Sequence, residues 1–261
     1  MKQIIGLALW ACFGLLVNRI DAQEKETNKP NIIILFADDL GYGDLSCYGA
    51  QDVNTPNIDA LAAEGLRFTD FQVASSVCSP SRAALLTGRY PMRNGFPVAQ
   101  GKIEKHKNYG LHSDEITIAD LLLKQEYATM AIGKWHLGFN EGHQPIDHGF
   151  QHFYGLQSNW HTSHPDLDDV YSDNKVVKEN VAFETLIGDY TNKAIEYMEE
   201  NKENPFFLYL AYHSVHSPIQ PSKEFIGTSK GSLYGDYVQE LEYHVGRLTQ
   251  ALADKKLDEN T

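Results

Sequence analysis

The sequence contains few cysteines: three in 261 residues, at positions 12, 47 and 78. Cys12 falls in an apolar N-terminal stretch, so the rest of the chain holds one possible disulfide bond at most. A bond between Cys47 and Cys78 is compatible with an oxidising compartment. It would, however, consume the Cys78 thiol, which stands in the most informative segment of the chain.

Basic residues are also scarce, with 22 Lys and Arg against 35 Asp and Glu and a formal net charge of −13. This balance argues against nucleic acid as a partner. It also means that the overall field of the protein does not attract an anionic ligand. Any such attraction must come from a local cluster of basic side chains.

Long apolar runs are limited to the N-terminus, where Lys2 precedes the stretch from Ile4 to Val17 and Ala22 precedes Gln23. This pattern predicts a cleavable signal peptide over residues 1–22 and therefore an exported protein, periplasmic or secreted. Ile20 is a poor residue three positions before the cut, which leaves an uncleaved anchor as the alternative. No later segment is apolar and long enough to cross a membrane, so we expect no stable span after cleavage.

The sequence has no internal repeat and no low-complexity linker. Residues 23–30 are charged and polar, which predicts a flexible lead-in. We therefore expect residues 31–261 to form one incomplete catalytic domain.

Apolar strand patterns alternate with helical patterns along the chain. We expect strands at 31–36, 66–73, 127–132 and 206–212, and helices at 57–64, 117–125, 180–201 and 238–252. Asn57 is the expected cap of its helix and Gly65 the stop. This alternation predicts an α/β fold in which helices cover both faces of a largely parallel sheet. Ligands of such sheets bind beyond the carboxyl ends of the strands.

Residues 78–89, Cys-Ser-Pro-Ser-Arg-Ala-Ala-Leu-Leu-Thr-Gly-Arg, place a thiol at the start of a predicted helix. We expect Ser79 as its cap, Pro80 at its first position and Gly88 as its stop. Free N–H groups at a helix N-terminus favour an anion, and Arg82 adds a positive charge one turn along. A cysteine at a helix start is more often a packed residue than a nucleophile.

The order of Cys78, Pro80 and Arg82, followed by Leu-Thr-Gly-Arg, resembles the signature of the type I sulfatases. In that family the cysteine is oxidised to formylglycine, whose hydrated aldehyde is the nucleophile. The resemblance implies an alkaline-phosphatase-like three-layer sandwich. It also implies a formylglycine-generating or sulfatase-maturing enzyme as a partner.

Asp38 and Asp39 follow the first predicted strand and precede Gly41-Tyr42-Gly43. Adjacent aspartates before glycine commonly form a turn. They also repel each other, and a hard divalent cation relieves this through oxygen ligands. The segment resembles the first metal motif of sulfatases, which implies that Asp38, Asp39 and the modified Cys78 bind Ca²⁺, with Mg²⁺ less favoured.

Two further segments follow strands. Alternation along an extended chain places Lys134 and His136 on one side, and His216 lies in His-Ser-Pro after the strand at 206–212. The resemblance assigns Lys134 to the sulfate, His136 to the formylglycine hydrate and His216 to the sulfate and the leaving group. It gives no role to His213.

The resemblance therefore implies an arylsulfatase-like hydrolase that cleaves sulfate monoesters through a covalent sulfo-enzyme intermediate. The expected substrate is a sulfated small molecule or a sulfated glycan. Two alternatives stay open: a phosphonate or phosphate monoester hydrolase of the same superfamily, and a truncated, non-catalytic anion-binding homologue.

The family pattern continues with a strand ending in Asp-Asn-Gly, which completes the metal site, and then a C-terminal subdomain. This sequence stops at residues 257–261, where that strand would begin. We therefore expect an N-terminal fragment of the family fold with an incomplete calcium site.

Overall fold

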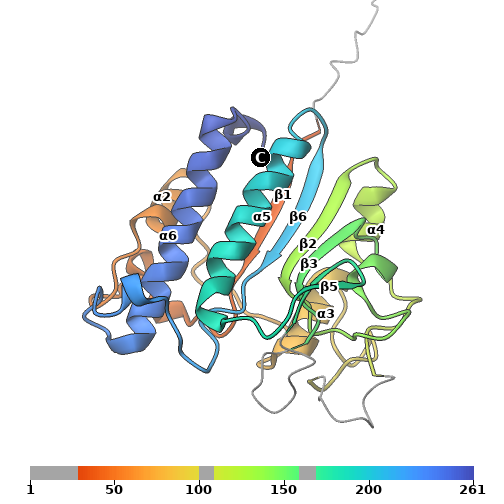
Figure 1. The fold of residues 1–261 in the computed structure, drawn as a ribbon, viewed down its shortest axis with the longest axis horizontal. Helices are drawn as coiled ribbons and strands as arrows, with labels where there is room; N and C mark the ends of the chain where they lie inside the picture. The colour runs from red at the N-terminus through yellow and green to blue at the C-terminus, as the bar shows by residue number, and fades with distance from the viewer. Residues whose placement is uncertain (1–28, 100–108, 159–168) are drawn as a thin grey trace, which may run out of the picture.

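A computed structural model describes residues 29–99, 109–158 and 169–261. The described residues form three layers, with a six-stranded sheet between two sets of helices (Figure 1). The strands lie in the order β1-β6-β2-β3-β4-β5. The predicted α/β class with a largely parallel sheet is therefore confirmed.

Four of the six strands are parallel. They are β1 (Ile32–Phe36), β6 (Phe206–Ala211), β2 (Ala128–Lys134) and β3 (His152–Leu156). The strands β4 (Val170–Ser172) and β5 (Lys175–Lys178) add antiparallel to the β3 edge. Every residue of β6 is buried, as a run of apolar residues between two helical layers requires.

The helices α5 (Leu186–Glu200) and α6 (Ser232–Asp254) cover one face of the sheet, and α2 (Pro56–Glu64) packs against α6 (Figure 1). The other face carries α3 (Cys78–Thr87) and α4 (Ile118–Leu123). Short 3₁₀ turns are η1 (Tyr42–Asp44), η2 (Ser46–Tyr48), η4 (Pro145–Asp147), η6 (Phe183–Thr185), η7 (Lys223–Phe225) and η8 (Asp258–Asn260). Two apolar clusters, one on each face of the sheet, fill the spaces between the layers.

The cap predicted for α2 was wrong. The helix begins at Pro56 and its N-cap is Thr55. The Asn57 backbone N–H donates instead to a carboxylate oxygen of Glu242 on α6 at 2.5 Å, and the Ile58 N–H donates to the other oxygen at 3.0 Å. A distant carboxylate therefore satisfies the free N–H groups of α2, which local sequence patterns do not reveal.

The strand predicted at residues 66–73 was also wrong, because this segment has no regular structure. Its large apolar side chains are exposed, at 88% for Leu66, 62% for Phe68 and 67% for Phe71. A strand needs a neighbour to pair its backbone, and within the described residues the segment pairs with none. Within the described residues, the outer edge of β1 is also unpaired.

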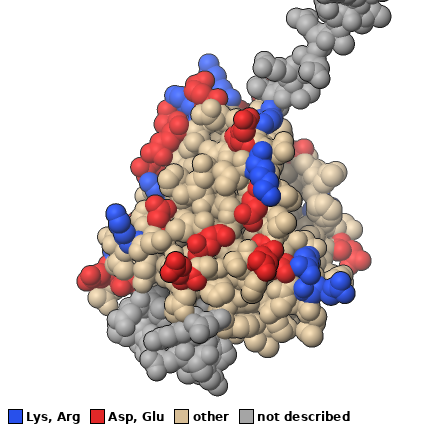
Figure 2. Space-filling model, turned by 90° about the vertical axis from the view of Figure 1, so that its right-hand side faces the viewer, with Lys and Arg blue, Asp and Glu red and all other residues tan. Residues whose placement is uncertain are grey.

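The predicted signal peptide at 1–22 and most of the lead-in at 23–30 lie outside the described residues. Among the helices that the structure describes, none combines the length and the apolarity needed to cross a membrane. On the described part of the face in Figure 2, acidic groups lie between the basic ones, so that part of the surface carries no broad basic patch.

Candidate active site

The carboxyl ends of β1, β2 and β6 bring the predicted site residues together at one edge of the sheet. Asp38 lies two residues beyond β1, and Lys134 is the last residue of β2. The Asp38 backbone N–H donates to the carbonyl of Ser214, three residues beyond β6, at 2.8 Å. This hydrogen bond ties the β1 and β6 exits to each other.

Asp38, Arg82 and Lys134 form a buried ion cluster at this edge. One Asp38 carboxylate oxygen lies 3.3 Å from Arg82 Nη2, and the other accepts a hydrogen bond from Lys134 Nζ. Arg82 Nη1 also donates to the Lys134 carbonyl at 2.5 Å. All three side chains are almost fully buried.

The cluster holds one more positive than negative charge. Burial alone would raise the pKa of Asp38, but Arg82 and Lys134 outweigh it and hold that pKa well below the usual range. Burial lowers the pKa of Lys134, while Asp38 opposes this shift. One carboxylate against two cations leaves a net positive site, which suits a small anion despite the acidic character of the whole chain.

Cys78 lies beside this cluster, but not at the helix position that we predicted. It is the first residue of α3, with Val77 as the N-cap, so neither Ser79 nor Pro80 opens the helix. The Cys78 Sγ lies 3.2 Å from His136 Nδ1, within hydrogen-bonding distance. A polar group at residue 78 therefore meets both a helix N-terminus and an imidazole.

His136 reaches Cys78 through backbone geometry that differs from the expected alternation. Its φ angle is 56°, in the left-handed region, so the chain is not extended at this residue. Its backbone N–H donates to the Gln157 carbonyl beyond β3 at 3.1 Å. Lys134 contacts Asp38 and His136 contacts Cys78, so both side chains lie at the same sheet edge. The left-handed backbone at His136, and not strand alternation, brings its ring to this edge.

His216 and Asp39 lie at the more open side of the site. His216 Nε2 is 3.8 Å from an Asp39 carboxylate oxygen, and the Asp39 side chain is 61% exposed. The two adjacent aspartates therefore have different surroundings: Asp38 is buried against cations, and Asp39 faces solvent near an imidazole.

His213 is a buried polar residue to which the family resemblance assigns no role. Its Nε2 lies 3.0 Å from the Tyr237 hydroxyl on α6. Burial, reinforced by Lys134, lowers the pKa of His213 to about 3, so the ring is neutral at physiological pH. The one available signal was its position two residues beyond a buried strand.

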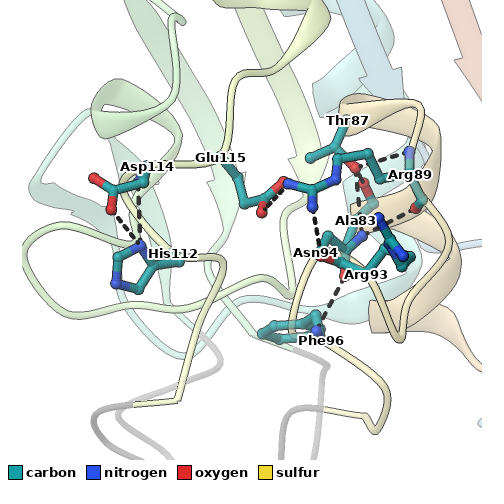
Figure 3. Close-up of polar contacts among 9 residues, drawn as sticks. All are labelled: Ala83, Thr87, Arg89, Arg93, Asn94, Phe96, His112, Asp114 and Glu115. Atoms are coloured by element: carbon teal, nitrogen blue, oxygen red, sulfur yellow. Dashed lines mark hydrogen bonds and ion pairs between the residues drawn. The ribbon is translucent and has the colours of Figure 1, made fainter.

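Polar contacts fix the C-terminal end of α3 and the loop after it (Figure 3). Gly88 has a φ angle of 65° and ends the helix as predicted. Arg89 forms an ion pair with Glu115 at 2.5 Å and donates to the Arg93 carbonyl at 2.8 Å. The Thr87 hydroxyl donates to the Ala83 carbonyl at 2.7 Å. These contacts fix the C-terminal end of α3. Cys78 is the first residue of this helix, and Arg82 lies near its middle.

The described residues fit a calcium site only in part. Asp38 and Asp39 offer the oxygen ligands that calcium prefers, but Asp38 is already paired with Arg82 and Lys134. Across the described ranges, no three acidic, His or Cys side chains gather as a group able to hold a metal ion. These residues therefore do not form a complete calcium site by themselves.

Comparison with known proteins identifies the family. The family model described as Sulfatase matches residues 30–261. The chain belongs to the sulfatase family. It is 37% identical over 253 residues to human N-acetylgalactosamine-6-sulfatase, and the aligned region covers 89% of this chain and 48% of that protein. This sulfatase chain thus spans about half the length of the curated relatives that it matches.

Solved structures support the fold. The crystal structure of Ps i-CgsB in complex with k-i-k-neocarrahexaose matches with a TM-score of 0.80 and 34% sequence identity. The match covers 90% of this chain and 57% of the Ps i-CgsB chain. The phosphonate monoester hydrolase of Agrobacterium radiobacter matches with a TM-score of 0.64 and 19% identity, over 89% and 61%. At that identity the second match shows a shared fold alone.

Proposed function

We propose that this chain carries part of the active site of a sulfatase that hydrolyses sulfate monoesters at residue 78. The observation that supports this most directly is the position of Cys78, at the first residue of α3 and 3.2 Å from His136, beside the Asp38-Arg82-Lys134 ion cluster. A nucleophile at that position meets a net positive, buried environment in which the negative charge of a sulfate group is stabilised.

Modified to formylglycine by a maturing enzyme, residue 78 would supply an aldehyde hydrate as the nucleophile. Arg82 and Lys134 provide fixed positive charge beside the sulfate. One hydroxyl of the hydrate would give up its proton and bond to sulfur while the S–O bond to the alcohol breaks, and His216, at the open side of the site, would donate a proton to the departing alcohol oxygen. The other hydroxyl would then give its proton to His136. This re-forms the aldehyde, breaks the bond between carbon 78 and the sulfated oxygen, and releases sulfate.

Asp38 and Asp39 are the residues that we propose as calcium ligands, because the family resemblance implies this ion. The substrate class that we propose is a sulfated small molecule or glycan, since one relative is named N-acetylgalactosamine-6-sulfatase and a similar structure, Ps i-CgsB, is in complex with k-i-k-neocarrahexaose. We also propose export to the periplasm or the outside of the cell, on the N-terminal pattern alone.

The test is Cys78→Ala, assayed for hydrolysis of an aryl sulfate ester, with Cys47→Ala as the matched control. Cys47 is the other cysteine of the described ranges, and its backbone N–H donates to Asp59, which is not part of the ion cluster. We expect the first variant to lose more than about a thousandfold in kcat, as removal of a nucleophile does, and the control to keep its rate. Full turnover by Cys78→Ala would refute the proposal.

Two measurements separate the alternatives. Relative rates on aryl sulfate and aryl phosphate esters distinguish a sulfatase from a phosphate or phosphonate ester hydrolase. The mass of the peptide that contains residue 78 shows whether the thiol is converted to an aldehyde. An unmodified thiol together with no hydrolysis of either ester would favour a non-catalytic anion-binding protein.

A further inference from the structure

Arg82 is the most deeply buried cation of the site, and its guanidinium contacts three different elements. Nη1 donates to the Lys134 carbonyl on β2, Nη2 faces the Asp38 carboxylate, and the group lies 5.3 Å from the centre of the Phe36 ring on β1. Nε and Nη2 are both buried without a hydrogen-bond partner, and of the two only Nη2 lies next to a carboxylate oxygen. Such a donor costs free energy unless an acceptor lies close by.

The Tyr209 hydroxyl is a candidate acceptor. Tyr209 lies on the central strand β6, is 1% exposed, and its ring is 6.2 Å from that of Phe36. Its oxygen is also buried without a well-formed hydrogen bond. Burial raises the pKa of Tyr209 while Arg82 lowers it, and Tyr209 in turn helps to raise the pKa of Arg82, so the two groups are electrostatic neighbours.

The apolar packing around Tyr209 does not need its oxygen. The ring packs among Phe36 and Phe150 in a cluster that also contains Phe207, so phenylalanine would satisfy the shape of the site. Two other buried tyrosines, Tyr190 and Tyr197 on α5, also have unpartnered hydroxyls. A buried hydroxyl alone is therefore no sign of function. Arg82 acts on the pKa of Tyr190 through its charge alone, whereas it acts on the pKa of Tyr209 as a hydrogen-bond partner as well, and this distinguishes Tyr209.

We propose that Tyr209 is a positioning residue for Arg82: its hydroxyl oxygen accepts a hydrogen bond from Arg82 Nε and keeps the guanidinium directed at the anion site beside residue 78. The proposal builds on the proposed sulfatase function, since it assumes an anion at that site. Tyr209 itself touches neither the anion nor Cys78 in this scheme.

The direct test follows the Arg82 Nε–H signal by NMR in protein labelled with ¹⁵N-arginine, assigned from its loss in Arg82→Lys. In Tyr209→Phe we expect this proton to exchange with solvent at least about tenfold faster, because a hydrogen bond to a charged group worth about 1.5 kcal/mol is lost. Tyr197→Phe is the matched control, because its hydroxyl has Glu200 as the one charged neighbour that affects its pKa. Equal exchange in Tyr209→Phe and the wild type would overturn the proposal.

The second measurement is the Kd for inorganic sulfate by calorimetry on the same proteins. We expect about threefold to tenfold weaker binding in Tyr209→Phe, no change in Tyr197→Phe, and unchanged or higher thermal stability in both. A weakened affinity in both variants, or in neither, contradicts the positioning role. Absence of sulfate binding in the wild type counts against the proposed function, while the exchange measurement still decides whether Tyr209 holds Arg82.

Discussion

Asp38 is the residue on which the buried charges of the site depend. It is the partner of both Arg82 and Lys134, and all three side chains lie out of contact with water. Removing one member of a buried ion cluster leaves the other charges uncompensated, which costs far more than losing an exposed pair.

We therefore expect Asp38→Asn to lower the free energy of unfolding by about 3–5 kcal/mol. Its neighbour offers a matched control, because Asp39 is 61% exposed and faces His216 across 3.8 Å. Asp39→Asn should cost less than about 1 kcal/mol. Urea unfolding of both variants at neutral pH measures the difference, and equal losses would show that the cluster does not depend on the Asp38 charge.

At the scale of elements, the end of β2 determines how Lys134 and His136 reach the sheet edge. Gly133 has a φ angle of 100°, and a Cβ there would lie 2.0 Å from the Ala211 carbonyl oxygen of β6. Its neighbour on β3, Gly155, is as closely packed, with 2.1 Å from its own Cβ position to the Gly133 carbonyl oxygen. The backbones approach so closely at this edge that no side chain fits between them.

Gly133→Ala should therefore destabilise the protein by about 3 kcal/mol or more, through both the clash and the left-handed backbone. Gly43→Ala is the control, because a Cβ at that position meets no atom within 4 Å. It should change stability by no more than about 1 kcal/mol. Thermal and urea unfolding test the pair, and a mild effect at Gly133 would mean that the strand ends separate easily.

At the scale of the whole molecule, the described chain leaves an apolar surface uncovered. Leu66, Phe68 and Phe71 are more than half exposed, and the rings of Phe68 and Phe71 lie 6.0 Å apart. Within the described residues, the outer edge of β1 is unpaired. Phe71 and Phe36 also line a groove between β1 and α3. Contiguous apolar surface and an open strand edge both favour association with another polypeptide surface.

We expect the chain to self-associate as its concentration rises, and the double variant Phe68→Ser, Phe71→Ser to weaken this at least about tenfold. Each phenylalanine buries about 150–250 Å² when covered, at about 25 cal/mol per Å². Leu121→Ser, at a residue of α4 that is 54% exposed, is the control. Sedimentation velocity measures the association, and equal behaviour of all three proteins would place the contact elsewhere.

Much of the fold followed from local pattern. The apolar runs at 31–36 and 206–212 became β1 and β6, and the amphipathic segments near 180–201 and 238–252 became α5 and α6. The strands β3, β4 and β5 were not predicted. The last two are short and every residue of β5 is exposed, so that neither shows a clear apolar period.

The residue types of the site were also readable, since cysteine, arginine, lysine and histidine at motif spacing follow three strands and open one helix. Their roles as catalytic and metal-binding residues stay predictions. Two of the failures share one cause, because each depended on a partner distant in sequence. Glu242 caps α2 from 185 residues away, and the segment at 66–73 lacks a strand partner within the described residues.

The sequence by itself indicated the family, the buried strands β1, β2 and β6, the main helices and the residues that meet at the sheet edge, because these depend on short-range pattern and motif spacing. The tertiary structure alone decided which charges pair. It buried Asp38 between Arg82 and Lys134, left Asp39 in solvent, turned His136 toward Cys78 and placed Tyr209 beside Arg82. Those outcomes depend on burial and on distances between segments far apart in the chain, and no local pattern contains either.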